Sequence, residues 1–213
     1  MRHVIWDWNG TLVNDLPIVV EAVNASLSAV GGPPIDADDY RDCYTRPVRL
    51  FYDKLLDRPV TDGEWHQIDD VFHGTYADAA DRVALTDDAR DAIAAVATAG
   101  GSQSILSMWW HEQLVPQVTR HGLDQFMVRV DGNVKDAGET KERLLAIHLD
   151  RLQSGNGGAV MIGDALDDAR ASIRLGLPCV LYDGGSHHRS GLESLGVPVA
   201  ASLLEAVDMA LSS

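Results

Sequence analysis

The feature that most constrains this chain is a regular alternation of short apolar segments and longer amphipathic segments over residues 83–213. The apolar segments have the length of strands, and the amphipathic ones carry apolar side chains at helical spacing. We expect strands over 103–107, 126–130, 159–162 and 179–182 and helices over 86–99, 112–121, 140–149 and 166–175, with a last helix opening at Ser202. Such an alternation with short links predicts an α/β fold, a doubly wound parallel sheet with a Rossmann-like core.

Polar residues follow the ends of several predicted strands. The first strand, His3–Trp6, runs directly into the loop Asp7-Trp8-Asn9-Gly10-Thr11. Ligands of doubly wound sheets bind outside the carboxyl ends of the strands. The residues found at these ends are Asp7 and Asn9, Ser107, the loop 131–141, Asp164 with Asp168, and the glycine-rich loop 184–189. The sequence therefore predicts a site at this edge of the sheet.

Residues 14–82 have a different pattern, with helical spacing and no strong strand. A first helix opens near Asp15 and ends at Gly31-Gly32, and the capping box Thr61-Asp62-Gly63-Glu64 opens another. We therefore expect a core domain made of residues 1–13 and 83–213, with a small helical cap domain, residues 14–82, inserted into it.

The charge of the chain limits its partners. The formal net charge is −15, and no run of Lys or Arg offsets it, so we expect no nucleic-acid partner. A negative surface also repels a phosphorylated metabolite. Any such substrate would therefore need a cation at its site.

The sequence carries no signal for a membrane or for export. Its apolar runs, such as 92–97, are far shorter than the roughly 20 residues that cross a bilayer, and the N-terminus lacks a signal-peptide pattern. The two cysteines, Cys43 and Cys179, fit a reducing compartment. We expect a cytoplasmic protein, either a monomer or a homodimer.

The residues at the strand ends suggest one kind of chemistry. Three carboxylates and an amide, with a lysine and a hydroxyl, suit Mg²⁺ beside a phosphoryl group. A carboxylate can attack phosphorus once the phosphoryl oxygens are neutralised by a metal and a lysine. Asp7 would be that nucleophile, while Ser107 and backbone amides would hold the remaining oxygens.

These residues resemble the haloacid dehalogenase-like hydrolase superfamily, whose four motifs have candidates here in the same order. Asp7-Trp8-Asn9-Gly10-Thr11-Leu12 resembles the first motif and Ile105-Leu106-Ser107 the second. Val160-Met161-Ile162-Gly163-Asp164 with Asp168 resembles the fourth. For the lysine of the third motif we prefer Lys141, which lies 23 residues before Asp164, over Lys135.

The resemblance implies a phosphatase that forms an aspartyl-phosphate intermediate on Asp7. One Mg²⁺ would be held by Asp7, the backbone carbonyl of Asn9, and Asp164, with Asp168 acting directly or through water. Residues 14–82 look like the helical cap of phosphoglycolate phosphatase-like members, which closes over the site and selects a small phosphorylated metabolite. The phosphate group would contact Asp7, Trp8, Asn9, Gly10, Ser107, Met108 and Lys141.

One residue departs from the family pattern. Phosphatases of this family usually carry a second aspartate two residues after the nucleophile, where it acts as general acid and base, and here that position is Asn9. General acid–base catalysis contributes about 10²- to 10⁴-fold in rate, roughly 3–5 kcal/mol of barrier. Three interpretations remain open: a substrate with a good leaving group, such as an acyl phosphate or phosphoanhydride; a proton supplied by the cap or by His111; or a protein that only binds phosphate or a partner.

Two further questions stay open in the sequence. A metal-independent 2-haloacid dehalogenase would use the same aspartate on carbon, but Asp164 and Asp168 would then have little purpose. The sequence does not identify the substrate, although five side chains are candidates to contact it. They are Arg46, Arg49 and Tyr52 in the expected cap, and Trp109 and His111 after Ser107, and packing or a solvated helix face explains each of them as well.

Overall fold

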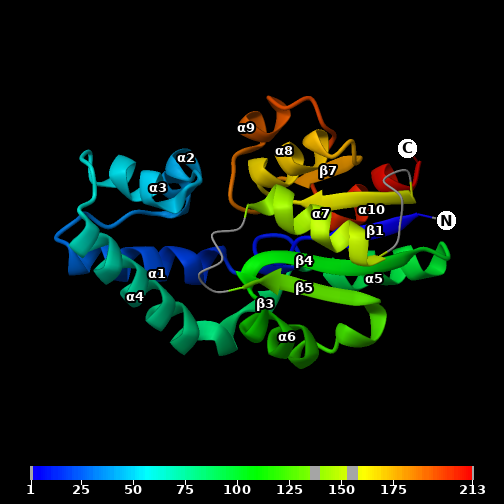
Figure 1. Ribbon diagram of the computed structural model, residues 1–213, viewed down its shortest axis with the longest axis horizontal. Coiled ribbons are helices and arrows are strands. Elements are labelled where there is room, and N and C mark those ends of the chain that lie inside the picture. The colour runs from blue at the N-terminus through cyan, green and yellow to red at the C-terminus, as the bar shows by residue number, and fades with distance from the viewer. Residues whose placement is uncertain (1, 135–139, 153–157, 213) are drawn as a thin grey trace. The chain divides into compact units, whose positions relative to one another are not determined.

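The computed structural model describes residues 2–134, 140–152 and 158–212 (Figure 1). The chain divides into two compact units, one made of residues 1–13 and 85–213 and the other of residues 14–84. Each unit is built around its own group of buried side chains. Among the described residues, none of the helices is both long and apolar enough to cross a membrane.

The larger unit contains a six-stranded sheet in the order β5-β4-β1-β6-β7-β8. All five neighbouring pairs are parallel, so the predicted α/β fold with a doubly wound sheet is confirmed. The strands are β1 (His3–Trp6), β4 (Ser102–Trp110), β5 (Arg129–Asn133), β6 (Ala159–Gly163), β7 (Cys179–Tyr182) and β8 (Val199–Ala200). The chain starts in the centre, builds one half of the sheet through β4 and β5, and then returns past β1 to build the other half. Parallel sheets of this kind have their ligand crevice where the strand order reverses, which here is at β1.

Helices cover both faces of this sheet (Figure 1). On one face α7 (Lys141–Leu152) packs beside α8 (Leu166–Arg174), and on the other α5 (Ala89–Thr98) packs beside α10 (Leu203–Ser212). The unit also contains α6 (His111–Arg120), the 3₁₀ turn η2 (Asp124–Phe126) and α9 (Arg189–Glu193). Because strand side chains alternate between faces, each buried strand contributes to two apolar layers.

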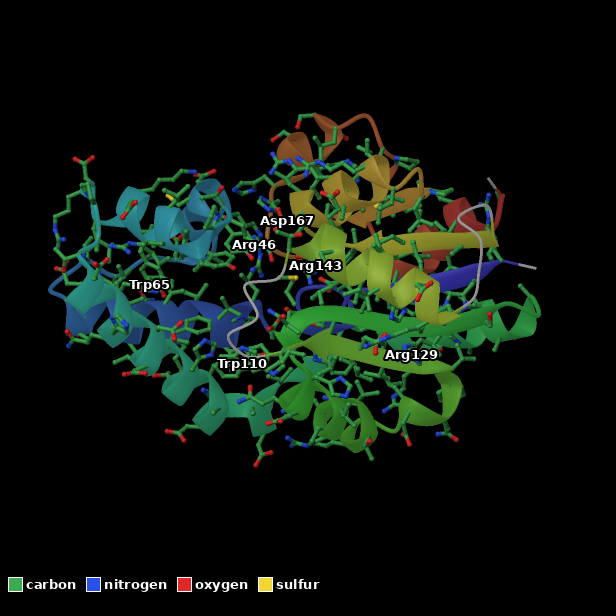
Figure 2. All side chains as sticks on the ribbon, viewed as in Figure 1. Arg46, Trp65, Trp110, Arg129, Arg143 and Asp167 are labelled. Atoms are coloured by element: carbon green, nitrogen blue, oxygen red, sulfur yellow. The ribbon has the colours of Figure 1, made fainter. Side chains whose placement is uncertain are left out.

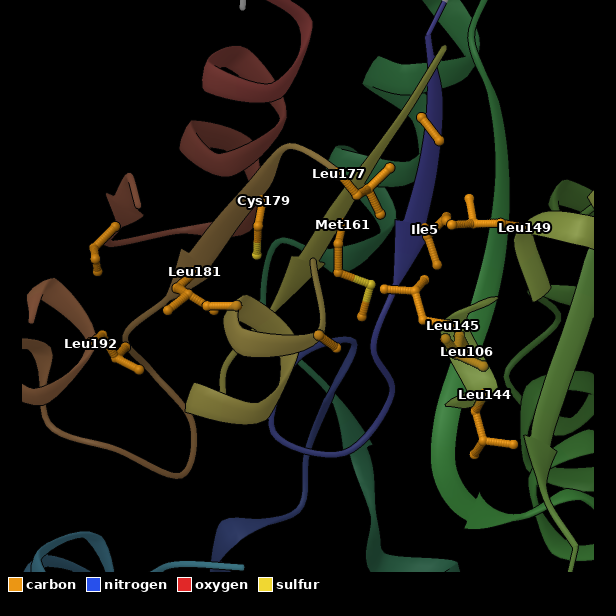
Figure 3. Close-up of a cluster of buried hydrophobic side chains, with 14 residues drawn as sticks. Ile5, Leu106, Leu144, Leu145, Leu149, Met161, Leu177, Cys179, Leu181 and Leu192 are labelled. Carbon is orange, nitrogen blue, oxygen red and sulfur yellow. The ribbon is translucent and has the colours of Figure 1, made fainter. Parts of the chain in front are cut away.

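An apolar layer lies under α7 and α8 (Figure 3). Strand residues such as Ile5, Met161 and Leu181 meet Leu145 and Leu149 of α7 in one continuous buried cluster. Burying a Leu or Ile side chain stabilises a fold by roughly 1.5–3 kcal/mol. This layer therefore stabilises the packing of α7 on the sheet.

The second unit is helical, with α1 (Leu16–Ala29), α2 (Ala37–Cys43), α3 (Val48–Leu55), α4 (Asp62–Ala79) and the turn η1 (Ala80–Arg82). The predicted capping box is present, since the Thr61 hydroxyl accepts a hydrogen bond from the Glu64 backbone N–H and the Glu64 carboxylate accepts one from the Thr61 backbone N–H. Its core is rich in aromatic rings, among them Tyr40, Phe51 and Tyr52. A two-stranded sheet of β2 (Val13–Asn14) and β3 (Ala84–Leu85) completes the list of elements.

Several predicted boundaries were wrong. α5 starts at Ala89 instead of residue 86, and α7 ends at Leu152 instead of residue 149. β4 continues to Trp110 instead of ending at Ser107, and β5 starts at Arg129 because Phe126 lies in a 3₁₀ turn. The longer β4 pairs Trp110 with Asn133, and this close approach depends on Gly132. A Cβ atom there would lie 2.7 Å from both the Trp109 carbonyl oxygen and the His111 Cα.

Part of the core under α7 is polar. His3 lies on β1 with its Nδ1 2.7 Å from the Ser102 hydroxyl and its Nε2 2.7 Å from the Ser104 hydroxyl. Burial and the neighbouring His148 lower the pKa of His3 to about 4. The folded protein therefore holds His3 neutral at pH values where an unfolded chain, with a histidine pKa of about 6.5, already binds a proton.

This pKa predicts loss of stability in acid. Stability from neutral His3 is fully present above pH ~6.5 and falls as the pH drops from ~6.5 to ~4, by about 2 kcal/mol after allowance for solvent screening. Urea unfolding at several pH values measures this. His3→Gln should flatten the pH dependence over that window, whereas the exposed-site control His66→Gln should keep it. Equal slopes for the two variants would refute the assignment.

Candidate active site

Asp7 is held at the central strand end of the sheet. It follows β1 directly, and its backbone N–H donates to the Ile162 carbonyl of β6 at 2.8 Å. The loop beyond it turns sharply at Gly10, whose φ of 73° favours glycine. A Cβ atom on Gly10 would lie 2.5 Å from Asp164 Oδ2, so the loop approaches that carboxylate because Gly10 has no side chain.

Lys141 joins the nucleophile candidate to a second carboxylate. It is the first residue of α7, and its ammonium group lies 2.6 Å from Asp7 Oδ1 and 2.8 Å from Asp168 Oδ1. A third hydrogen bond runs to the Leu106 carbonyl at 3.2 Å, so all three donors of the ammonium have partners. The alternative lysine, Lys135, lies outside the described residues.

The two aspartates of the fourth motif are fixed by different loops. Asp164 accepts from the Thr11 hydroxyl at 3.0 Å through Oδ1 and from the Ser186 backbone N–H at 2.7 Å through Oδ2. Asp168, near the start of α8, accepts from the Ala165 N–H at 3.1 Å through Oδ2. The first loop and the loop after β7 therefore meet at Asp164.

The three carboxylates form one buried group. Asp7, Asp164 and Asp168 each place an oxygen within 4.8 Å of the others, and this is the arrangement that could hold a metal ion. Three carboxylates beside one ammonium leave two net negative charges in a site shielded from water. Buried charges need a partner, and oxygen ligands suit Mg²⁺, so a divalent cation fits both the charge and the donor atoms.

The electrostatics of the group agree with this excess of negative charge. Burial, together with the neighbouring Asp168 and Asp164, raises the pKa of Asp7 to about 8 against the opposing charge of Lys141. Burial and the charge of Asp168 raise the pKa of Asp164 to about 6. Burial would lower the pKa of Lys141, but the carboxylates of Asp168 and Asp7 outweigh it and raise that pKa above its usual value.

Ser107 and Asn9 lie side by side at the ends of β4 and β1. The Ser107 hydroxyl is 3.4 Å from Asn9 Oδ1 and accepts a hydrogen bond from the Trp109 N–H at 3.0 Å. The predicted phosphate contact Trp8 is buried, with its ring 6.0 Å from that of His121, and Met108 packs against the core under α7. The two polar side chains thus share the edge where Asp7 lies.

The candidate substrate residues near β4 differ from expectation in their setting. Trp109 and Trp110 belong to the end of β4, which runs past its predicted end at Ser107. Figure 2 labels Trp110. His111 begins α6, and its Nδ1 accepts from the Gly132 N–H at 3.2 Å. A neutral His111 therefore carries its proton on Nε2.

The candidates in residues 14–84 are partly explained by that unit alone. Arg49 makes contacts within its own unit. One guanidinium nitrogen lies 2.8 Å from Asp62 Oδ1, and another donates to the Val60 carbonyl. Tyr52 is 2% exposed and packs in the aromatic core of this unit, and its contact with substrate stays a prediction. Arg46 is exposed (Figure 2) and stays a prediction.

Comparison with known proteins agrees with the motif order. The family model described as haloacid dehalogenase-like hydrolase matches residues 4–182. The chain belongs to this family of hydrolases. The matched range contains all five candidate site residues, Asp7, Ser107, Lys141, Asp164 and Asp168.

Two curated relatives of this hydrolase are phosphoglycolate phosphatases. The plasmid-encoded one from Cupriavidus necator is 26% identical, with 98% of this chain and 92% of the relative covered. That from Synechococcus elongatus is 25% identical, with 90% and 88% covered. Among solved structures, a predicted phosphatase from Clostridium acetobutylicum matches with a TM-score of 0.87 at 16% identity over 100% of this chain and 99% of its own. CbbY from Rhodobacter sphaeroides, solved with phosphate, matches with a TM-score of 0.74 at 18% identity over 96% of each chain. At these identities the structures show that the hydrolase shares their fold.

Residues that sequence reasoning missed belong to the loop after β7. That loop was expected near the site, but no signal singled out Ser186, because its contact to Asp164 uses a backbone N–H that every residue except proline has. Gly185 was missed as well. A Cβ atom there would lie 2.2 Å from Asp164 Oδ2, and this closeness is visible only in three dimensions.

Gly185→Ala is therefore expected to push Asp164 out of place. Overpacking of this kind costs about 1–3 kcal/mol, which corresponds to a fall of several degrees in the melting temperature of this hydrolase. Gly191→Ala in α9 is the matched control, since a Cβ atom there meets nothing within 4 Å. Thermal unfolding of both variants measures the effect. Equal melting temperatures would contradict the close contact.

Proposed function

We propose that this hydrolase is a Mg²⁺-dependent phosphatase of a small phosphorylated metabolite, with Asp7 as its nucleophile. The observation that carries the proposal is the buried group of Asp7, Asp164, Asp168 and Lys141, whose two excess negative charges match one divalent cation. Both curated relatives are phosphoglycolate phosphatases, which supports a small phosphomonoester as substrate.

Accessibility favours Asp7 over the other two carboxylates as nucleophile. The Asp7 side chain is 12% exposed, whereas that of Asp168 is 1% exposed and Asp164 as a residue is 1% exposed. A phosphoryl group can therefore reach Asp7 more readily. Asp164 and Asp168 would serve as metal ligands together with Asp7 and the Asn9 carbonyl.

The reaction would proceed in two displacements at phosphorus. An Asp7 oxygen forms a bond to phosphorus as the bond to the leaving oxygen breaks, and water then releases phosphate and restores the carboxylate. Bound Mg²⁺ would supply charge neutralisation for the phosphoryl oxygens. Lys141 holds Asp7 in one orientation. The Ser107 hydroxyl and the backbone N–H groups of residues 8–10 and 108 would donate hydrogen bonds to the phosphoryl oxygens.

Phosphate release with and without Mg²⁺ tests this proposal. With p-nitrophenyl phosphate and phosphoglycolate as substrates, release should depend on Mg²⁺, and Asp7→Asn should lower it by at least 10³-fold because the amide cannot attack. Asp91→Asn makes the same change at an exposed position of α5 and should leave release unchanged.

Three other outcomes would point elsewhere. Release that persists in Asp7→Asn would reject the nucleophile. Phosphate binding without any turnover would favour a binding protein on the same fold. Halide release from a 2-haloacid in the presence of a chelator would favour a dehalogenase.

Because Asn9 replaces an acid, we expect the rate of turnover to depend strongly on the leaving group of the substrate. The Asn9 amide cannot protonate a departing alkoxide, so we expect better turnover of acetyl phosphate than of phosphoglycolate. Asn9→Asp should raise kcat for phosphoglycolate by about 10²-fold or more, with little change for acetyl phosphate. The control Asn14→Asp adds the same charge at an exposed position. An unchanged rate on phosphoglycolate would show that another group already supplies the proton.

A further inference from the structure

A chain of polar side chains, all buried except Ser102, crosses the sheet beneath α7. It runs from Ser102 through His3, Ser104 and His148 to Asp131, and every link is 2.7 Å long. His3 lies on β1, both serines on β4, Asp131 on β5 and His148 on α7. The chain therefore ties three neighbouring strands to one helix through directional contacts, and nothing in the proposed chemistry uses it.

The hydrogen positions in this chain can be assigned from its chemistry. The carboxylate of Asp131 only accepts, so His148 donates from Nδ1. In one consistent arrangement, His148 Nε2 accepts from the Ser104 hydroxyl. Ser104 then accepts from His3 Nε2, and His3 Nδ1 accepts from Ser102. Every donor in this arrangement finds an acceptor. A fully satisfied buried network favours one geometry over its alternatives.

Asp131 is the fixed end of this chain. In addition to His148 it accepts from Arg129 Nε at 2.5 Å, on the same strand (Figure 2), and from Arg151 Nη1 at 3.1 Å, on α7. Burial would raise the pKa of Asp131, but hydrogen bonds from His148 and Arg129 outweigh it and hold that pKa below its usual value. Asp131 therefore stays charged and binds α7 through His148 and Arg151.

The same helix carries Lys141 at its first position. Lys141 and His148 are seven residues apart, which is close to two full turns, so both face the sheet. Lys141 reaches the Leu106 carbonyl and His148 reaches Ser104, two residues earlier on β4, and Asp131 pairs in register with Leu106.

The rest of that helix face is apolar and cannot set the helix position alone. Leu144 and Leu145 lie between Lys141 and His148, and Leu149 follows His148. Apolar contacts are not directional, and a shift of one residue would turn the helix by about 100° and move it by about 1.5 Å. Such a shift would carry the Lys141 ammonium away from Asp7.

We infer that His148 and Asp131 are positioning residues for the reaction, which set the rotation and height of α7 and so place the Lys141 ammonium against Asp7. The inference rests on the proposed function, because Lys141 matters for turnover only if Asp7 is the nucleophile. Neither residue touches the reacting atoms.

Three variants of α7 test the inference. His148→Leu keeps the volume and helix propensity but loses both hydrogen bonds, while Asp131 retains its two arginines. His148→Asn places an amide nitrogen where Nδ1 was and keeps the bond to Asp131. Leu149→Ala weakens the same helix by removing apolar contacts alone.

The expected result separates positioning from stability. His148→Leu should lower kcat for p-nitrophenyl phosphate by about 10- to 100-fold with KM within about 3-fold, because Lys141 acts on the charge at Asp7. His148→Asn should stay within about 3-fold of the unsubstituted protein, and Leu149→Ala should lose melting temperature with kcat nearly unchanged. A kcat for His148→Leu no lower than that of Leu149→Ala would overturn the inference.

A crystal structure of His148→Leu gives a readout independent of activity. The distance from Lys141 Nζ to Asp7 Oδ1, 2.6 Å here, should lengthen beyond hydrogen-bonding range. An unchanged distance would overturn the inference even if the protein proves not to be a phosphatase. Absence of turnover in the unsubstituted protein, with the distance lengthened in the variant, would instead count against the proposed function alone.

Discussion

The ion pair of Lys141 with Asp7 and Asp168 is the interaction on which the rest of the site depends. One ammonium group lies within 2.8 Å of two carboxylates that belong to different strand–helix links, and all three residues are buried. Removing the ammonium or the carboxylates would leave the opposite charge buried without a partner, which costs several kcal/mol. The single ammonium does not balance the charge of the site, because Asp164 adds a further negative charge. This excess of negative charge is the reason for proposing a cation at the site.

The fold brings these charges together through its central strand. β1 lies between β4 and β6, so the loops that follow all three strands converge on Asp7. Glycines allow the convergence, since Gly10 and Gly185 each leave room for the Asp164 carboxylate between two loops. The apolar layer under α7 supplies most of the stability there, while a thin line of polar contacts gives that helix a defined position.

Sequence was sufficient for the fold and for the main charges of the site. The alternation of residues 103–182 predicts the parallel sheet because strand and helix periods differ, and the strand ends identify Asp7 and Asp164 without any contact being known. Lys141 could be preferred over Lys135 through spacing and the family resemblance. Its contact with Asp7 needed coordinates.

What sequence could not supply depends on contacts between distant segments. Ser186 reaches Asp164 with a backbone N–H, which leaves no trace in residue type. The extension of β4 to Trp110 depends on space at Gly132, and Tyr52 is buried in an aromatic core that its helical spacing did not reveal. The link from Asp131 to His148 spans 17 residues and two elements, so neither residue stood out by itself.

A crystal structure of the protein with Mg²⁺ and beryllium fluoride tests the central claim most directly. The account predicts one ion between Asp7 and Asp164 with Mg–O distances of about 2.1 Å, and beryllium bonded to an Asp7 oxygen. Density for the ion at another place, or an Asp7 carboxylate without beryllium at saturating fluoride, would contradict it.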